Sequence, residues 1–345
     1  MKNNPYTLSF GKLPNQLISR STLSLSILDD FRSETPSQQL YLITGVRGSG
    51  KTVLLSEVSK SLKENKDWIV VELNPELNLL ESLVSKLYSE KSLSKLFKEA
   101  KLNFSFFGFG LEVSTEPQIT DIETALIKML NVLKKKKKRL LITIDEASNT
   151  KNMKVFVSSF QILIRNDLPV FLLMTGLYDN IQNLQNEKNL TFLYRAPKIE
   201  LQPLNIRSIS ENYKNVLNVD DKTASEMAKL TKGYSFAFQV LGYLAWENNG
   251  FNKKVLSSYK QYLEDYVYEK IWSELSMQDR TVANAIARSK DGKISDIRKT
   301  LNYENNQFNP YRKRLIKKGL INGDTYGYVS FVLPLFDEYV KENDI

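Results

Sequence analysis

The sequence of 345 residues contains no cysteine and no histidine. Disulfides, zinc fingers, thiol nucleophiles and histidine general bases are therefore excluded. Any catalytic base or metal ligand in this chain has to be a carboxylate, a hydroxyl, a lysine or a backbone group.

Long apolar runs are also lacking. The longest, such as Leu140 to Ile144 and Val170 to Met174, have the length of a buried strand. A span across a bilayer takes roughly 20 residues. The N-terminus has no continuous apolar core of the kind found in signal peptides. We expect a cytoplasmic protein with no membrane partner.

The residues that are present are typical of a soluble globular chain, with 42% apolar and 25% charged residues. Short apolar runs alternate with helical patterns from about residue 40 to about residue 201, which predicts a parallel sheet covered by helices on both faces. The fold class is therefore α/β. The predicted strands are Leu40–Thr44, Trp68–Leu73, Leu140–Ile144, Val170–Met174 and Ala196–Leu201.

Two segments interrupt this alternation. Phe104 to Val113 alternates aromatic and small residues, which predicts a hairpin inserted between two helices. Lys134 to Arg139 is a run of six cations at the end of a predicted helix. The run either complements the negative end of the helix dipole, the reading that we favour, or contacts DNA.

One motif carries specific chemistry. Residues 45–52 fit G-x-x-x-x-G-K-[ST] in full, and they lie between a predicted strand and a predicted helix, as this phosphate-binding loop (P-loop) requires. The glycines let backbone N–H groups converge on a phosphate without Cβ clashes, and the helix N-terminus adds a positive dipole. The motif predicts a site for ATP with Mg²⁺. Its residues are Gly45, Val46, Arg47, Gly48, Ser49, Gly50, Lys51 and Thr52.

Within this motif, Lys51 is expected on the β- and γ-phosphates and the Thr52 hydroxyl on Mg²⁺. Asp145 and Glu146 follow the apolar strand 140–144, at the strand end where open α/β sheets bind ligands. Asp145 is predicted to hold the Mg²⁺ shell. Glu146 is predicted to accept the proton of an attacking water, because no histidine is available.

A further predicted strand, 68–73, lies between the P-loop and Asp145 in the sequence. Together with the glutamate after the aspartate, this arrangement indicates the additional-strand class of P-loop ATPases. Thr175 follows the strand 170–174 and is either a polar sensor of the γ-phosphate or a hydroxyl that closes a strand. Arg195 is either a neutraliser of phosphate charge, in its own or a neighbouring subunit, or a plain surface arginine.

At these residues the sequence resembles AAA+/STAND-type ATPases related to the archaeal and bacterial origin-recognition and Cdc-type ATP-binding proteins. The resemblance rests on the P-loop, on Asp145-Glu146 and on three weaker stretches. These stretches are Asn4-Pro5-Tyr6 with Gly11 and Ile18-Ser19-Arg20, then Thr191–Ala196 followed by Leu201–Leu204, and finally Thr231–Tyr234 through Gly242-Tyr243. The resemblance implies that the N-terminal segment with Arg20 packs near the adenine and that a helical lid domain follows the core.

The sequence departs from this family in two places. Ser19 stands where the family usually has glycine. Initiators also carry a sensor arginine soon after the lid glycine, whereas Gly233 is followed here by Tyr234, Ser235, Phe236 and Ala237. Without that cation the lid cannot contact the γ-phosphate in the initiator manner, so hydrolysis is expected to be slow or activated only in an assembly.

The last 70 residues predict a winged helix-turn-helix. Helices are predicted at 276–289, 294–301 and 306–318, followed by a two-stranded wing over 321–332. Ten cations against three acids between residues 288 and 318 carry most of the net charge of +9. Winged helices bind either DNA or protein, and the cations favour double-stranded DNA. The residues expected to contact DNA are Asn306, Gln307, Asn309, Tyr311, Arg312 and Arg314.

The sequence therefore predicts four parts: an N-terminal segment over 1–37, a P-loop ATPase core over 38–203, a helical lid over 204–274 and a winged helix over 275–345. We interpret the chain as a DNA-associated ATPase that uses Mg-ATP to switch its conformation or assembly. The alternative is a STAND-like signalling switch whose winged helix contacts protein. A homo-oligomer is compatible with either reading.

Overall fold

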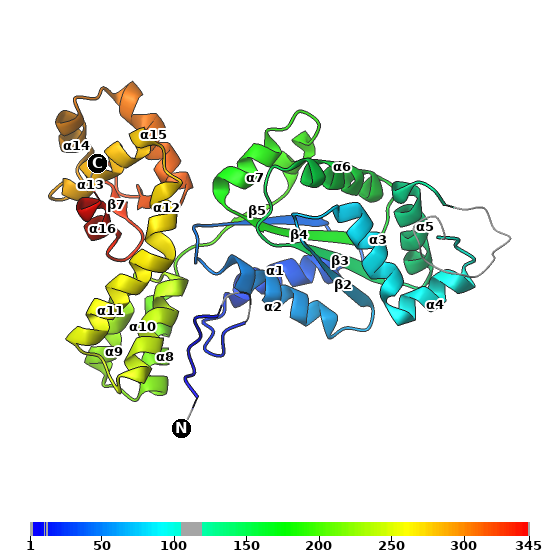
Figure 1. The fold of residues 1–345 in the computed structure, drawn as a ribbon, viewed down its shortest axis with the longest axis horizontal. Helices are drawn as coiled ribbons and strands as arrows, with labels where there is room; N and C mark the ends of the chain where they lie inside the picture. The colour runs from blue at the N-terminus through cyan, green and yellow to red at the C-terminus, as the bar shows by residue number, and fades with distance from the viewer. Residues whose placement is uncertain (1–2, 10, 12, 105–118, 344–345) are drawn as a thin grey trace. The chain divides into compact units, whose positions relative to one another are not determined.

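The computed structural model describes residues 3–9, 11, 13–104 and 119–343, so the predicted hairpin at 104–113 lies outside the described residues except for its first one. The chain forms two compact units (Figure 1). The sheet unit comprises Ser21–Thr44 and Leu54–Glu200, and the lid unit comprises Met1–Arg20, Gly45–Val53 and Leu201–Ile345. Within the described ranges, no helix is long and apolar enough to cross a membrane.

The sheet unit contains a five-stranded parallel sheet with the order β2-β3-β4-β1-β5, which confirms the predicted fold class. β4 pairs with β1 on one side and with β3 on the other. The strand inserted between the P-loop strand and the strand of Asp145 is therefore β4, whereas the 68–73 strand lies at the sheet edge. The strands are β1 (Leu40–Thr44), β2 (Trp68–Leu73), β3 (Arg139–Ile144), β4 (Val170–Gly176) and β5 (Lys198–Glu200).

Helices cover both faces of this sheet, so β1 and β4 are buried along their whole length and β3 at every residue except Arg139. Figure 1 shows α1 and α2 next to each other on one face, and α3, α5 and α6 on the other. The helices are α1 (Ser21–Arg32), α2 (Lys51–Lys63), α3 (Leu79–Ser89), α4 (Lys91–Glu99), α5 (Ile122–Lys135), α6 (Lys151–Arg165) and α7 (Tyr178–Gln185), with a short 3₁₀ helix η2 (Thr191–Arg195) before β5.

Helix α1 is held on its face of the sheet by aromatic packing. The fully buried ring of Phe31 lies 5.5 Å from the ring of Tyr41 and 5.0 Å from that of Phe171. Arg139, the last cation of the 134–139 run, donates to the carbonyls of Phe31 (2.6 Å) and Ser33 (2.7 Å). Arg139 therefore satisfies carbonyls at the C-terminal end of α1, where a cation also complements the helix dipole.

The lid unit is helical apart from its P-loop and a small sheet. The helices that we call the lid are α8 (Ile206–Leu217), α9 (Asp221–Leu230), α10 (Ser235–Glu247), α11 (Lys253–Leu263), the π-helix η3 (Glu264–Tyr268) and α12 (Glu269–Ser273). The C-terminal module contains α13 (Met277–Arg288), α14 (Ile294–Leu301), α15 (Asn305–Lys317), β6 (Ile321–Asn322), β7 (Ser330–Phe331) and α16 (Phe336–Glu342). One hydrophobic core runs through the lid and the C-terminal module.

The N-terminal segment is anchored to the lid by Tyr6. Its ring is buried between Tyr213 and Phe238, and its hydroxyl lies 2.8 Å from Asn212 Oδ1. A Cβ on Gly242 would lie 2.5 Å from the Tyr6 ring, so this close approach requires the glycine. The tyrosine of the Asn-Pro-Tyr stretch thus has a packing role against α8 and α10.

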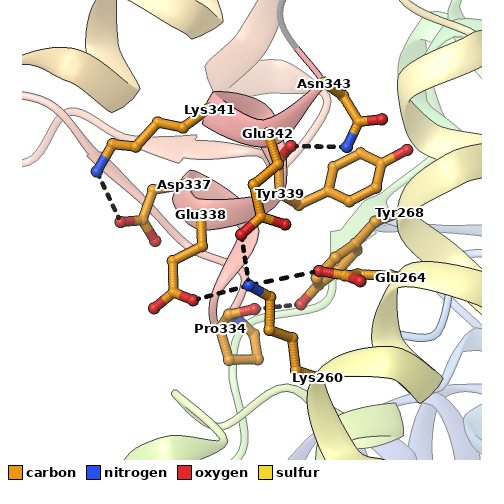
Figure 2. A network of polar contacts seen from close by, with 10 residues as sticks. All are labelled: Lys260, Glu264, Tyr268, Pro334, Asp337, Glu338, Tyr339, Lys341, Glu342 and Asn343. Carbon is orange, nitrogen blue, oxygen red and sulfur yellow. Dashed lines mark hydrogen bonds and ion pairs between the residues drawn. The ribbon is translucent and has the colours of Figure 1, made fainter. Parts of the chain in front are cut away.

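Polar contacts attach the last helix to the lid (Figure 2). The ammonium of Lys260 on α11 lies 2.7 Å from Glu342 and 3.3 Å from Glu338, both on α16. The hydrogen bond with Glu342 is the main cause that raises the pKa of Lys260 above its usual value, so this lysine stays charged. The Tyr268 hydroxyl donates to the Pro334 carbonyl just before α16. These contacts keep the C-terminal module and the lid together in one unit.

Candidate functional site

The P-loop begins directly after β1 and ends in the first turn of α2. Gly48 and Gly50 have φ angles of 70° and 94°, a region that disfavours residues with a Cβ. The Lys51 ammonium donates to the carbonyls of Gly45 and Val46, each at 3.0 Å. The lysine side chain is thus folded over the loop that its own helix follows.

A turn of the lid contacts the next three carbonyls of the P-loop. This lid turn comprises residues 234–236. Tyr234 is the N-cap of α10, and Ser235 and Phe236 are the first two residues of that helix. The Tyr234 hydroxyl donates to the Arg47 carbonyl (2.5 Å), the Ser235 hydroxyl to the Ser49 carbonyl (2.9 Å), and the Phe236 N–H to the Gly48 carbonyl (3.1 Å).

The sequence shows that this turn lacks a cation, but it does not show that the turn contacts the P-loop. Tyr234 and Arg47, which this contact joins, are 187 positions apart in the chain. The resemblance of Thr231–Tyr234 to the family lid was a signal for the turn itself, but not for what the turn touches.

Two arginines are held at the P-loop, Arg20 beside it and Arg47 within it. Arg20 donates to the Gln202 carbonyl (2.7 Å) and lies 3.5 Å from the Ser235 hydroxyl, and a Cβ on Gly50 would be 3.4 Å from its guanidinium. Arg47 forms an ion pair with Glu274 at 2.7 Å, after α12. The predicted nucleotide-binding residue Arg20 is thus next to the P-loop, and Arg47 links the P-loop to the segment that leads into the C-terminal module.

The predicted acidic residues lie at the carboxyl ends of β3 and β4, which are neighbours in the sheet. The Thr175 hydroxyl donates to the Asp145 carboxylate, and Thr175 is completely buried. The Glu146 N–H lies 3.2 Å from the Thr175 hydroxyl and 3.2 Å from Asp145 Oδ1. The structure therefore brings all three predicted residues together.

Glu146 also has an unusual backbone conformation, with a φ angle of 56°. A non-glycine residue in this region is uncommon and costs free energy, and such residues cluster at functional sites. The strained backbone leaves the Glu146 side chain exposed, whereas the next residue, Ala147, is buried and donates its N–H to the Thr175 carbonyl at 2.7 Å. Arg195 is exposed at the end of η2.

These residues fit a phosphate chain and a magnesium ion. The Ser49 hydroxyl, inside the P-loop, is buried without a hydrogen-bond partner among the described residues. No described group of three or more Asp or Glu residues has the geometry of a metal site. Mg²⁺ in nucleotide sites is characteristically held by one or two protein ligands and by the phosphates themselves, so it does not require a cluster of carboxylates.

The predicted DNA-contact residues of α15 divide into two groups. Arg314 donates from Nε (2.8 Å) and Nη2 (2.8 Å) to Asp279, whose side chain is 3% exposed. Arg312 donates to the Gly323 carbonyl at 3.2 Å, and the Tyr311 ring packs against the Arg314 guanidinium. Both arginines are thus used inside the module.

The polar residues at the start of α15 are exposed. Gln307 belongs to a capping box, in which its side chain accepts from the Glu304 N–H at 2.8 Å. Asn306 and Asn309 are exposed. Of the ten cations between residues 288 and 318 that favour DNA in the sequence, the exposed ones are Arg288, Lys290, Lys293, Lys299, Lys313 and Lys317.

Parts of the sequence match known protein families. Residues 17–165 match the AAA ATPase domain family, and residues 265–340 match a domain family of unknown function (DUF8462). No curated protein matches the sequence.

Two solved structures have a similar fold over nearly the whole chain. The Walker-type ATPase PABY2304 of Pyrococcus abyssi is 18% identical with a TM-score of 0.64, and the match covers 94% of this chain and 96% of that one. The ORC2 protein of Aeropyrum pernix is 14% identical with a TM-score of 0.62, covering 97% and 95%. Residues 17–165 therefore form an AAA ATPase domain, and the chain as a whole shares the fold of these two proteins.

Proposed function

We propose that this protein binds Mg-ATP through its P-loop and hydrolyses it slowly. The observation that carries the proposal is the bonded group of Asp145, Thr175 and Glu146 at the end of β3 and β4, in a chain whose P-loop motif is complete. The similar ORC2 protein was solved in complexes with ADPNP and ADP, which supports the choice of an adenine nucleotide.

Each residue has a role that follows from its chemistry. Lys51 exchanges its two carbonyl partners for phosphate oxygens, which are stronger acceptors for an ammonium. Thr52 and Asp145 hold the magnesium ion, which neutralises phosphate charge. Thr175 donates to Asp145 and so fixes the orientation of that carboxylate. Glu146 is exposed and takes a proton from the attacking water.

We further propose that the C-terminal module is a winged helix that associates with duplex DNA. The order of its elements, three helices and then a two-stranded antiparallel sheet, supports the winged-helix assignment. Exposed lysines of this module, among them Lys290, Lys293, Lys299, Lys313 and Lys317, supply positive charge. Because lysine is a point charge, this surface favours the phosphate backbone over base edges.

The second candidate function is a signalling switch whose module contacts protein. The inward hydrogen bonds of Arg312 and Arg314 favour it, because they leave these arginines engaged within the module. In this reading the nucleotide state changes the assembly of the protein, with little turnover.

One experiment tests both proposals: ATPase rate with and without duplex DNA, together with a titration of duplex DNA from about 50 to 200 mM salt. We expect measurable Mg-dependent hydrolysis, and DNA affinity that falls steeply as salt rises. Absence of DNA binding at the lowest salt would refute the DNA proposal and favour the protein switch. Absence of both nucleotide binding and hydrolysis would refute the ATPase proposal.

A further inference from the structure

The backbone carbonyls of the P-loop from Gly45 to Ser49 all have hydrogen-bond donors. Lys51 serves the first two, and the Arg47, Gly48 and Ser49 carbonyls are served by the lid turn, residues 234–236. The lid thus contacts the P-loop through its peptide groups and not through a cation.

We propose that the lid turn is a positioning element of the nucleotide site, in which Tyr234 and Ser235 orient the peptide groups that bind phosphate; this inference rests on the proposed ATP binding. The hydroxyls of Tyr234 and Ser235 orient these peptide groups, whereas the turn has no arginine.

The geometry of the trans peptide explains how the hydroxyls act. The N–H and the C=O of one peptide group point in opposite directions. The Arg47 carbonyl shares its peptide with the Gly48 N–H, and the Ser49 carbonyl shares its peptide with the Gly50 N–H. When Tyr234 and Ser235 hold the two carbonyls on the lid side, the two N–H groups point away from the lid turn.

These two peptides are also the ones that most need to be held. Each precedes a glycine with positive φ, at 70° for Gly48 and 94° for Gly50, and glycine restricts its peptide planes least of all residues. The contact is close, since a Cβ on Gly48 would lie 2.2 Å from the Tyr234 hydroxyl. Gly48 therefore admits the tyrosine and, for the same reason, depends on it for orientation.

The Tyr234 hydroxyl keeps its proton and therefore remains a hydrogen-bond donor. The side chain is 5% exposed, and burial raises the pKa of its phenol far above the usual value. The phenol stays protonated and donates to the carbonyl, which only accepts. Arg20 Nη1 also lies 3.5 Å from the Ser235 hydroxyl, so the predicted nucleotide-binding arginine and the lid turn are in contact.

The test uses the full-length protein with Tyr234→Phe, Ser235→Ala and the double variant. Tyr234→Phe keeps the buried ring, and Ser235→Ala keeps or improves helix propensity at the start of α10. One hydrogen bond to a carbonyl changes an affinity by roughly threefold to tenfold. We expect each single variant to weaken MgATP and MgADP binding by that factor, and the double variant by at least tenfold.

Two further variants separate orientation from stability. Tyr213→Phe removes another buried lid hydroxyl, which donates to the Phe238 carbonyl at 2.8 Å within the lid. It is expected to lower the free energy of unfolding without changing nucleotide affinity more than twofold. Ser235→Thr retains the hydroxyl and is expected to bind MgATP and MgADP as tightly as the parent.

The inference is overturned if the double variant binds MgADP as tightly as the parent, or if Tyr213→Phe weakens binding as much as Tyr234→Phe does. In both cases the parent still binds nucleotide and the proposed function stands. If the parent itself binds no nucleotide, the proposed function fails first and the positioning role fails with it.

Discussion

The end of β3 and the face of α15 both gather polar and charged side chains, but they use them in opposite ways. At β3, Asp145 and Thr175 bond to each other while the Glu146 carboxylate remains exposed. On α15, Arg314 is bonded to the buried carboxylate of Asp279 within its own module. The first region leaves the Glu146 carboxylate exposed, whereas the second uses Arg312 and Arg314 in hydrogen bonds within the module.

The largest effect is expected at the exposed glutamate. Glu146→Gln removes the base and keeps the size of the side chain, so the hydrolysis rate should fall by about 10² to 10⁴ while ATP affinity stays within about threefold. Single-turnover hydrolysis and equilibrium binding measure the two quantities. Glu64→Gln, an exposed change after α2, is the control. An unchanged hydrolysis rate in Glu146→Gln would assign the base elsewhere.

The next effect is expected in the C-terminal module. Arg314→Leu leaves the buried carboxylate of Asp279 without its cation. We expect a loss of about 2–4 kcal/mol in the free energy of unfolding, measured by urea denaturation. Lys313→Leu, one residue earlier on the exposed side, should change it by about 0.5 kcal/mol or less. Equal losses in both variants would mean that the Arg314–Asp279 pair does not stabilise the module.

Thr175→Val sharpens the same comparison from the other side. It removes the hydroxyl that donates to Asp145 and that the Glu146 N–H contacts. The free energy of unfolding should fall by about 1–2 kcal/mol, and the gain in ATP affinity on adding Mg²⁺ should shrink. Thr175→Ser should restore both. A valine variant with normal magnesium dependence would reduce Thr175 to a strand-closing residue.

The smallest effect concerns a carboxylate with a purely structural role. Burial acts to raise the pKa of Asp30, but hydrogen bonds from Ser37, Tyr41 and Gln38 outweigh it and lower the pKa below its usual value. A lowered pKa in the folded state adds stability above the unfolded value near 3.8, which is lost as pH falls through the folded value.

Asp30→Asn should therefore flatten the acid side of the stability profile, in the region below about pH 4, and lower stability at neutral pH by less than about 1 kcal/mol, because water screens this partly exposed carboxylate. Thermal denaturation from pH 2 to 7 measures both. If the stability of Asp30→Asn falls with decreasing pH as steeply as that of the parent, other carboxylates cause the pH dependence.

The sequence predicted the sheet well because its signals are local. β1 and β2 have the predicted bounds, since each is a short apolar run between polar segments. The P-loop motif and the pair Asp145-Glu146 could be assigned from residue types and their position after strands. Helix α14 likewise has the predicted bounds.

Other features depend on which face of an element turns inward or on distant contacts. The cations of α15 look alike in the sequence, and only packing against α13 distinguishes Arg314 from Lys313. The position of β4 between β1 and β3 follows from the topology of the sheet and not from the order of strands along the chain. The lid turn on the P-loop joins segments that nothing in the local pattern connects.

The most direct test of the account is the affinity of MgATP for the parent, Lys51→Ala and Lys63→Ala, measured by isothermal titration calorimetry. Lys63 is an exposed lysine at the other end of the same helix, so its variant controls for the loss of one positive charge. The account predicts that the parent and Lys63→Ala bind alike and that Lys51→Ala binds at least about 100-fold more weakly. Undiminished MgATP affinity in Lys51→Ala would contradict the assignment of the P-loop as the nucleotide site.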